Sequence, residues 1–277
     1  GHDDVLHFHL SCYGADFLTD TGRYTYMENE QRRYFKESLQ HNTVSVDGKT
    51  ISEYIDSWNW GRVVNPVYPH WRTHEHFDYV QAGHDGYWRL EEPVHVLRQI
   101  LFVKPDYWLV VDTLRSNGPH EYAQHFHFAE DVVVTMNQTN GVVHGDRSDG
   151  TGLQMIPVMP VVAEIKDCWI SRNYNHKQKS SKIIYTKTGQ GLTRFVTVLI
   201  PQHDLGENNW KIREIDVFDT YDRKIDPEEA IALEIQRPKT AELVLFSHQG
   251  PRGYQFSGCQ MCGEVLLVKK QDDNEQK

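Results

Sequence analysis

Cysteine is scarce in this sequence, which has four among its 277 residues. A disulfide framework for a chain of this length would need a denser set, so that class of scaffold is excluded. Cys259 and Cys262 form a lone Cys-x-x-Cys pair. A zinc site needs further close ligands and a redox site needs a βαβ setting. Neither is visible, so we interpret both residues as ordinary thiols.

Long hydrophobic runs and excess positive charge are also missing. No apolar segment approaches the ~18 residues of a membrane-spanning helix, and we therefore expect no membrane span. The 29 Lys and Arg residues are outnumbered by 39 Asp and Glu, which gives a formal net charge of −10. Since nucleic acids are bound largely through Lys and Arg on phosphate, no nucleic-acid partner is expected. A local basic patch remains compatible with an acidic sugar ligand.

Helical periodicity is rare, and the dominant hydrophobic period is two, which indicates β-strands. Two apolar runs flank the turn at 104–106 and predict a hairpin over 94–111. In the strand over 120–128, His125 and His127 alternate with aromatic residues, and we expect them to face a polar layer. Further strands are predicted at 131–136, 153–165, 183–187, 193–200, 210–218, 229–236, 241–247 and 264–269.

Short strands at this spacing predict an all-β fold. We expect a large antiparallel β-sandwich over 1–203 and a smaller C-terminal β-sheet region over 204–277. The boundary is placed where an apolar strand gives way to a polar, glycine-containing stretch near 201–209. Residues 28–39 give the main helical signal, which is enough for a short turn of helix.

Histidine is abundant, with 16 residues, and the densest polar cluster lies near the N-terminus. His2 and Asp4 share one side of an extended segment. Asp20 follows a short strand, and His41 precedes a strand that ends in an Asp-Gly turn. Two imidazoles and one carboxylate, from His2, Asp20 and His41, suit a zinc ion. The alternative is that these histidines form structural hydrogen bonds, and the spacing alone leaves both interpretations open.

A basic and aromatic cluster follows the first one. It is either a solvated face or a surface for sulfate or carboxylate groups, because Arg offers a bidentate fork and Tyr stacks on sugar rings. No GxSxG, Walker loop, dinucleotide fingerprint or HExxH motif is present. The members of this cluster are Tyr24, Tyr26, Arg32, Arg33, Tyr34 and Lys36.

Three ordered blocks of the sequence resemble the heparinase II/III-like family, which includes heparin lyases and alginate lyases. They are His2-Asp3-Asp4-Val5-Leu6-His7-Phe8, Asp20-Thr21-Gly22-Arg23-Tyr24, and His41-Asn42-Thr43-Val44 with Asp47-Gly48. The resemblance implies a β-sandwich with a single structural zinc held by His2, Asp20 and His41. It also implies that Tyr24 lies near the substrate cleft, and we add Arg33 as a second substrate-binding residue from the basic cluster.

The chemistry that the resemblance implies is β-elimination at a uronic acid of heparin, heparan sulfate or alginate type. The family carries its catalytic groups on a helical domain and on one His that would precede this sequence. We therefore assign no catalytic residue here and expect this portion to be inactive without an upstream helical domain of the same parent protein.

Two other functions stay open from the sequence. One is a stand-alone, non-catalytic carbohydrate-binding or scaffolding β-sandwich, with an acidic polysaccharide or oligosaccharide as its partner. The other is a zinc hydrolase, for which Asp4 is the only evident general base. The sequence leaves the compartment undecided among periplasm, secretion and cytoplasm.

Overall fold

The computed structural model describes residues 1–203, 210–226, 228–237, 240–247 and 252–271. The fold is all-β with antiparallel sheets, which confirms the predicted class. The chain divides into two compact units, Gly1–Leu205 and Gly206–Lys277.

The first unit is built on one ten-stranded sheet. Its strand order is β4-β5-β6-β7-β12-β10-β9-β8, with β3 added on β7 and β11 added on β12. A separate hairpin, β1 (Leu10–Cys12) and β2 (Ala15–Leu18), precedes it. The strands of the large sheet are β3 (Val44–Val46), β4 (Pro66–Thr73), β5 (Phe77–His84), β6 (His95–Val103), β7 (Tyr107–His127), β8 (Val133–Met136), β9 (Val143–Asp146), β10 (Thr151–Pro157), β11 (Val162–Asn173) and β12 (His176–His203).

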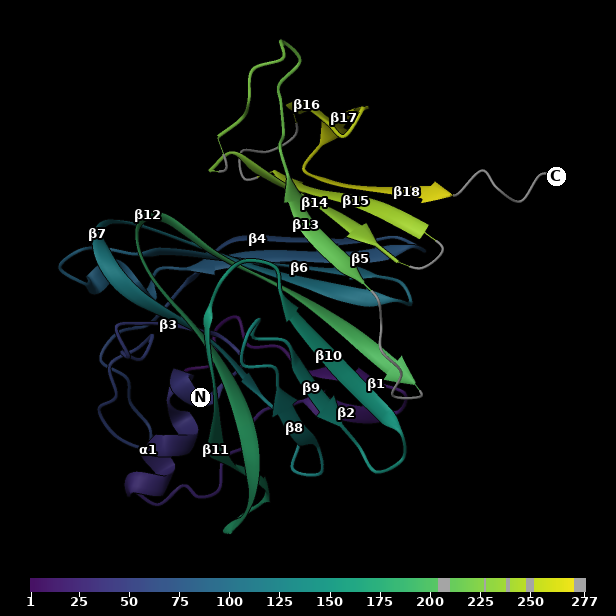
Figure 1. Cartoon of the computed structure of the whole chain (residues 1–277). Coiled ribbons are helices and arrows are strands. Elements are labelled where there is room, and N and C mark those ends of the chain that lie inside the picture. The colour runs from purple at the N-terminus through teal and green to yellow at the C-terminus, as the bar shows by residue number, and fades with distance from the viewer. Residues whose placement is uncertain (204–209, 227, 238–239, 248–251, 272–277) are drawn as a thin grey trace. The chain divides into compact units, whose positions relative to one another are not determined.

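The long strands β7 and β12 run through both layers of a sandwich, so that the one sheet folds over on itself. Figure 1 shows them curving from one layer into the other. Their antiparallel register shifts between Gly189 and Gly191, opposite the segment 116–120. Gly191 has a φ of +74°, which an L side chain rarely adopts, so the glycine suits a bend in the paired strands. Tyr122, Phe126 and Tyr185 are fully buried between the layers.

Little of the first unit is helical. The helix α1 (Glu30–Lys36) begins at Asn29, whose side chain accepts a hydrogen bond of 2.9 Å from the Arg32 backbone N–H. The 3-10 turns η1 (Ser38–Gln40) and η2 (Gly86–Arg89) are the other short elements. The helical turn predicted at 28–39 is confirmed. In the described ranges, every helix is too short or too polar to cross a bilayer.

The second unit has a four-stranded antiparallel sheet in the order β13-β14-β15-β18, and a separate hairpin of β16 and β17. Cys259 packs against the core of this unit, whereas Cys262 is exposed. Residues three apart on a strand point to opposite faces, so the two thiols do not converge on one site. The strands are β13 (Lys211–Ile215), β14 (Ala230–Gln236), β15 (Thr240–Ser247), β16 (Arg252–Phe256), β17 (Cys259–Gly263) and β18 (Val265–Gln271).

Candidate functional site

Three segments of the first unit converge at a cluster of imidazoles and a carboxylate. His7 comes from the N-terminal segment, Asp20 follows β2, and His41 follows η1. Their ligand atoms all lie within 4.8 Å of one another, and in the described part of the chain they are the one group of three that could hold a metal ion. Asp20 Oδ2 lies 2.9 Å from His41 Nδ1 and 3.7 Å from His7 Nε2.

Asp20 is positioned by a turn that only glycine can make here. The Gly22 backbone N–H donates to Asp20 Oδ1 at 2.6 Å, and Gly22 has a φ of +82°. Gly22 also pairs with Ser171 of β11, and a Cβ on Gly22 would lie 2.0 Å from the Ser171 carbonyl oxygen. The Asp-Thr-Gly sequence therefore brings the carboxylate to the site and lets its backbone lie against β11.

Asn42 joins the three segments together. Its side-chain NH₂ donates to the carbonyls of Phe8, at 2.9 Å, and Thr19, at 3.3 Å. Its backbone N–H donates to His7 Nδ1 at 2.9 Å, and its Oδ1 accepts from the His127 backbone N–H at 2.7 Å. Sequence reasoning assigned no role to Asn42, although this residue stands beside His41 in the His-Asn-Thr-Val block.

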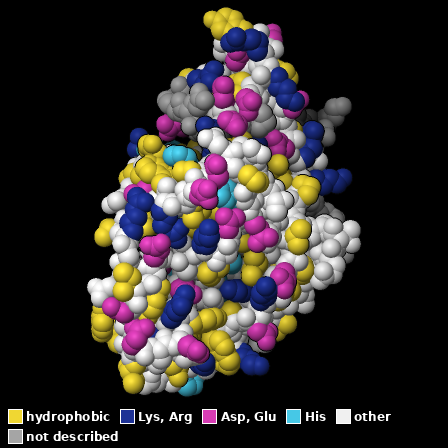
Figure 2. Space-filling model, turned by 90° about the vertical axis from the view of Figure 1, so that its left-hand side faces the viewer, with side chains coloured by type: hydrophobic (Ala, Val, Ile, Leu, Met, Phe, Trp, Pro, Cys, Tyr) yellow, Lys and Arg dark blue, Asp and Glu magenta, His cyan; other side chains and the backbone are white. Residues whose placement is uncertain are grey.

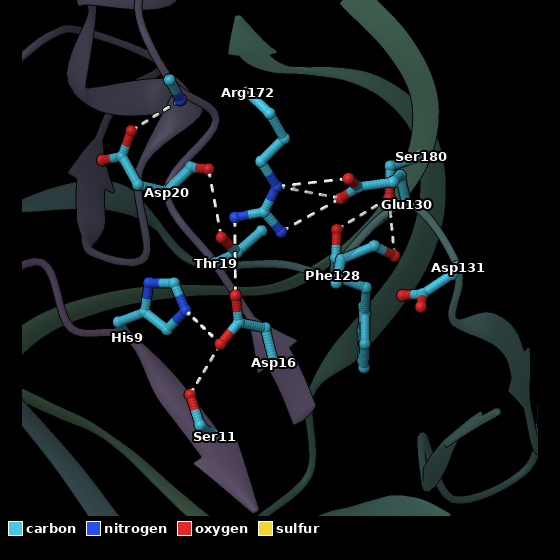
Figure 3. Close-up of polar contacts among 12 residues, drawn as sticks. His9, Ser11, Asp16, Thr19, Asp20, Phe128, Glu130, Asp131, Arg172 and Ser180 are labelled. Atoms are coloured by element: carbon cyan, nitrogen blue, oxygen red, sulfur yellow. Dashed lines mark hydrogen bonds and ion pairs between the residues drawn. The ribbon is translucent and has the colours of Figure 1, made fainter. Parts of the chain in front are cut away.

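An ionic network fixes the hairpin that leads to Asp20. Figure 3 shows Arg172 of β11 between Asp16 of β2 and Glu130. The Arg172 guanidinium lies 3.5 Å from Asp16 Oδ2 and 3.0 Å from Glu130 Oε2. His9 Nε2 lies 3.1 Å from the other oxygen of Asp16. The β1–β2 hairpin is therefore tied to the sheet just before the site.

Burial and charge keep the His7 imidazole neutral and the Asp20 carboxylate ionised near neutral pH. Burial lowers the pKa of His7 to about 4, against an opposing effect of the Asp20 charge. Burial by itself would raise the pKa of Asp20, but its hydrogen bonds with His41 and Gly22 hold that pKa well below its usual range. Neutral imidazole and ionised carboxylate are the protonation states that metal binding requires.

His2 lies beside this cluster and outside the group of three. Its ring centroid is 5.5 Å from that of His41, and its Nε2 lies 3.1 Å from Arg32 Nη1. Burial, followed by the His41 charge, lowers the pKa of His2 to about 4. The structure thus brings Asp20 and His41 into contact, as the sequence predicts, and it groups the ligand atoms of His7, rather than those of His2, with them. His7 stands in the first matching block, but no motif distinguished it from the other histidines.

The donor chemistry fits a zinc ion. Zinc in proteins is bound by imidazole nitrogens, carboxylate oxygens and thiolates, usually four in number. His41 Nε2 is buried and has no hydrogen-bond partner in the structure. A buried polar atom of this kind calls for an explanation, and a bound ion is a common one.

Of the two residues predicted to bind substrate, Tyr24 packs against α1 and Arg33 lies within that helix. The Tyr24 ring stacks on Phe35 with centroids 5.7 Å apart, and Lys177 Nζ lies 5.6 Å from the Tyr24 ring. Arg33 Nε donates to Glu37 Oε1 at 2.6 Å. Arg33 also lines an open cavity of about 520 Å³. Its other lining residues include the basic Lys49 and Arg89 and the acidic Glu37, Glu53 and Glu91.

The face of the molecule that carries α1 has mixed charge. Figure 2 shows basic, acidic and exposed hydrophobic side chains interspersed on it. This face is therefore not one continuous basic patch, and any recognition of an anion must depend on particular side chains.

Comparison with known proteins agrees with this fold. The family described as heparinase II/III-like, C-terminal, matches residues 1–212. A heparin-sulfate lyase of Pedobacter heparinus is 21% identical over 215 residues, which cover 75% of this chain and 30% of that protein. A heparin-sulfate lyase of Bacteroides stercoris is 19% identical over 201 residues, which cover 70% of this chain and 28% of the relative.

Solved structures show the same fold. The crystal structure of heparan sulfate lyase HepC from Pedobacter heparinus matches with a TM-score of 0.70 at 18% identity, covering 98% of this chain and 37% of that one. A heparinase III structure matches with a TM-score of 0.65 at 15% identity, covering 98% and 36%. The chain spans about a third of the length of these relatives. Because the family match covers the whole of the first unit, this protein belongs to the heparinase II/III-like family, as a C-terminal domain of that family.

Proposed function

We propose that this chain is the β-sandwich portion of a polysaccharide lyase that acts on uronic-acid glycans of the heparin or heparan sulfate type. The observation that carries the proposal is the family match over residues 1–212, joined to relatives named heparin-sulfate lyase. Its catalytic groups would come from an upstream helical domain of the same parent protein. Alginate is the second substrate class to test, because the family also includes alginate lyases.

The proposed reaction is β-elimination. A base removes the proton on C5 of the uronic acid, the electron pair forms the C4–C5 double bond, and the bond from C4 to the glycosidic oxygen breaks. The leaving oxygen takes up a proton, and the negative charge that develops at the carboxylate must be stabilised. In this chain we propose Arg33 and Tyr24 as substrate contacts, because Arg33 lines the cavity beside α1 and half-buried Tyr24 lies against that helix.

We also propose that Asp20, His41 and His2 hold a structural zinc. His7 Nε2 lies 3.7 Å from Asp20 Oδ2, but His7 Nδ1 accepts a hydrogen bond from the backbone N–H of Asn42. Neutral His7 therefore carries its proton on Nε2, the nitrogen that faces Asp20. Ligation by His7 Nε2 would give up that hydrogen bond to a fixed backbone donor. His2 Nε2 instead accepts from a side-chain donor, Arg32 Nη1. The zinc would cross-link the N-terminal segment, the loop after β2 and the entry to β3.

Ultraviolet absorbance of the unsaturated product tests the lyase proposal. The parent protein with its upstream region and the 277-residue chain are each incubated with heparan sulfate, heparin and alginate. We expect product from the parent on at least one glycan and little from the chain alone. Absence of product from the parent on all three would refute the lyase proposal. Full activity of the chain alone would show that the catalytic groups lie within these 277 residues.

A further inference from the structure

Three exposed aromatic rings from distant parts of the sequence meet beside α1. The exposed fractions of Tyr26, Trp58 and Tyr174 are 39%, 70% and 50%. Tyr26 stacks on Trp58 with ring centroids 5.6 Å apart and planes 11° apart, and the Tyr174 ring lies 6.0 Å from the Tyr26 ring. Singly exposed aromatics are ordinary, but three that share one surface indicate a site for a ligand with an apolar face.

The backbone holds these rings in place. The tip of the β11–β12 hairpin, which carries Tyr174, is joined to the 20–26 loop, because the Asn175 N–H donates to the Tyr24 carbonyl at 2.7 Å. The Thr25 hydroxyl lies 3.3 Å from the Tyr174 hydroxyl. The Trp58 N–H donates to Asp56 Oδ1 at 2.7 Å, which closes the turn that presents the indole.

Two arginines without carboxylate partners lie against this aromatic surface. The guanidinium carbons of Arg23 and Arg32 lie 5.3 and 5.2 Å from the Tyr26 ring centroid. Within the described residues, neither Arg23 nor Arg32 has a carboxylate within ion-pair distance. The nearby Glu28 carboxylate is already engaged, because it accepts hydrogen bonds from the Tyr54 hydroxyl and the Ser57 N–H.

Arg32 is the most unusual of these cations, because its side chain is only 3% exposed. Its Nη1 lies 3.1 Å from His2 Nε2, its Nη2 donates to the Ser57 carbonyl at 3.1 Å, and its Nε is buried with no partner. Buried charges in proteins are usually paired. An unpaired guanidinium beneath exposed rings favours an anion as the missing partner.

We propose that Tyr26, Trp58 and Tyr174, together with Arg23 and Arg32, form a subsite for one acidic sugar residue of a bound glycan. The pyranose face stacks on the exposed indole, and a sulfate or carboxylate group pairs with the guanidinium groups. The proposal rests on the proposed function for its ligand class. It adds a location on the protein surface, next to His2, at which a charged sugar residue of the glycan is bound.

Calorimetric titration of the 277-residue chain with a heparin-derived tetrasaccharide tests the subsite. An alginate tetrasaccharide, which has carboxylates and no sulfates, separates the two anions, and maltotetraose serves as the uncharged probe. The variants are Trp58→Ala and Arg23→Gln, both at exposed positions. The matched controls are Trp71→Ala, at a Trp that is 64% exposed on β4, and Arg72→Gln, at its exposed neighbour. Thermal unfolding confirms that all four variants are folded.

We expect the heparin tetrasaccharide to bind more tightly than maltotetraose. Its Kd should rise roughly 3–10-fold in Trp58→Ala and in Arg23→Gln, and stay within about twofold in the two controls. Equal losses in site and control variants, or equal affinity for maltotetraose, would overturn the subsite. The subsite would also be overturned if the 277-residue chain does not bind the tetrasaccharide while the parent protein still releases unsaturated product. In each of these cases the lyase proposal is tested separately, by whether the parent protein releases unsaturated product.

Discussion

Arg98 and Asp112 face each other across β6 and β7 in a bidentate ion pair. Arg98 Nε lies 2.7 Å from Asp112 Oδ1, and Arg98 Nη2 lies 2.7 Å from Oδ2, with both side chains buried. The remaining nitrogen, Nη1, donates to the carbonyls of Leu6 and Asn42. The pair therefore supports two of the segments that form the candidate metal centre.

Removal of one partner of this pair is expected to cost far more than loss of an exposed pair. Arg98→Met leaves the Asp112 carboxylate buried without its cation, so we expect the free energy of unfolding to fall by about 3–5 kcal/mol in urea denaturation. Arg33→Met is the matched control, because Arg33 is largely exposed in its ion pair with Glu37. Loss of that pair should lower the free energy of unfolding by less than about 1 kcal/mol. Similar losses in the two variants would contradict this assignment.

The sequence predicted most of the strands, because hydrophobic alternation reports directly which side of a strand is buried. It divided β12 in two, at 183–187 and 193–200, although the structure has one strand from His176 to His203. The segment Gly189-Gln190-Gly191 has the composition of a turn. In the structure it is a bulge, and cross-strand hydrogen bonds to β7 continue on both sides of it. Local composition cannot distinguish these two uses of glycine.

Zinc content is expected to follow the proposed ligands. The purified chain should hold one zinc per molecule by elemental analysis. His41→Ala, Asp20→Ala and His2→Ala should lose it, because each removes one of three protein donors. Chelation should lower the thermal midpoint of the wild type by roughly 5–10 °C, corresponding to about 2.7 kcal/mol of linkage at a hundredfold excess of zinc over Kd.

His7→Ala decides which imidazole is the third ligand. If His2 is the ligand, His7→Ala keeps its zinc, although it loses the hydrogen bond with Asn42. Loss of zinc in His7→Ala together with retention in His2→Ala would instead assign the ion to the group of three found in the structure. A wild-type chain without metal, and with a melting curve insensitive to chelator, would end the zinc proposal.

The sequence predicted that Asp20 and His41 lie together, because Asp20 comes directly after one short strand and His41 comes shortly before another. Both residues were therefore expected at the ends of neighbouring strands. It could not rank His2 against His7. That choice depends on where the N-terminal segment runs, and the carbonyl hydrogen bonds that Phe8 and Leu6 accept from Asn42 and Arg98 determine its path. Such contacts link residues 34 and 92 positions apart, and no local pattern records them.

Gly22→Ala is expected to damage the turn that carries Asp20. The substitution adds left-handed backbone strain and a Cβ only 2.0 Å from the Ser171 carbonyl oxygen, so we expect a loss of about 2–4 kcal/mol of stability. Gly14→Ala is the control, with a similar φ of +77° and open space around the new Cβ, and should cost about 1 kcal/mol. Zinc affinity should fall in Gly22→Ala alone. Equal effects of the two substitutions would show that the contact with β11 is not tight.

Buried His125 is expected to make the fold less stable in acid. Its Nε2 lies 2.8 Å from the Ser45 hydroxyl, and its Nδ1 is buried without a partner. Burial, followed by the charges of Lys182 and Arg98, lowers the pKa of His125 to about 3. In the unfolded chain a His titrates near 6.5, so between pH 6.5 and about 3 the unfolded state binds a proton that the native state excludes.

Stability from His125 is therefore present above pH 6.5 and is lost as the pH falls, by about 1.4 kcal/mol per pH unit. Between pH 7 and pH 5 this amounts to about 2 kcal/mol. Urea denaturation at pH 5, 6 and 7 should show a pH dependence smaller by that amount in His125→Gln, whose side chain can still bond with Ser45 but does not titrate. His74→Gln, at an exposed position, serves as the matched control. If His125→Gln keeps the wild-type slope, protonation of another buried group, such as His84, is responsible for the acid sensitivity.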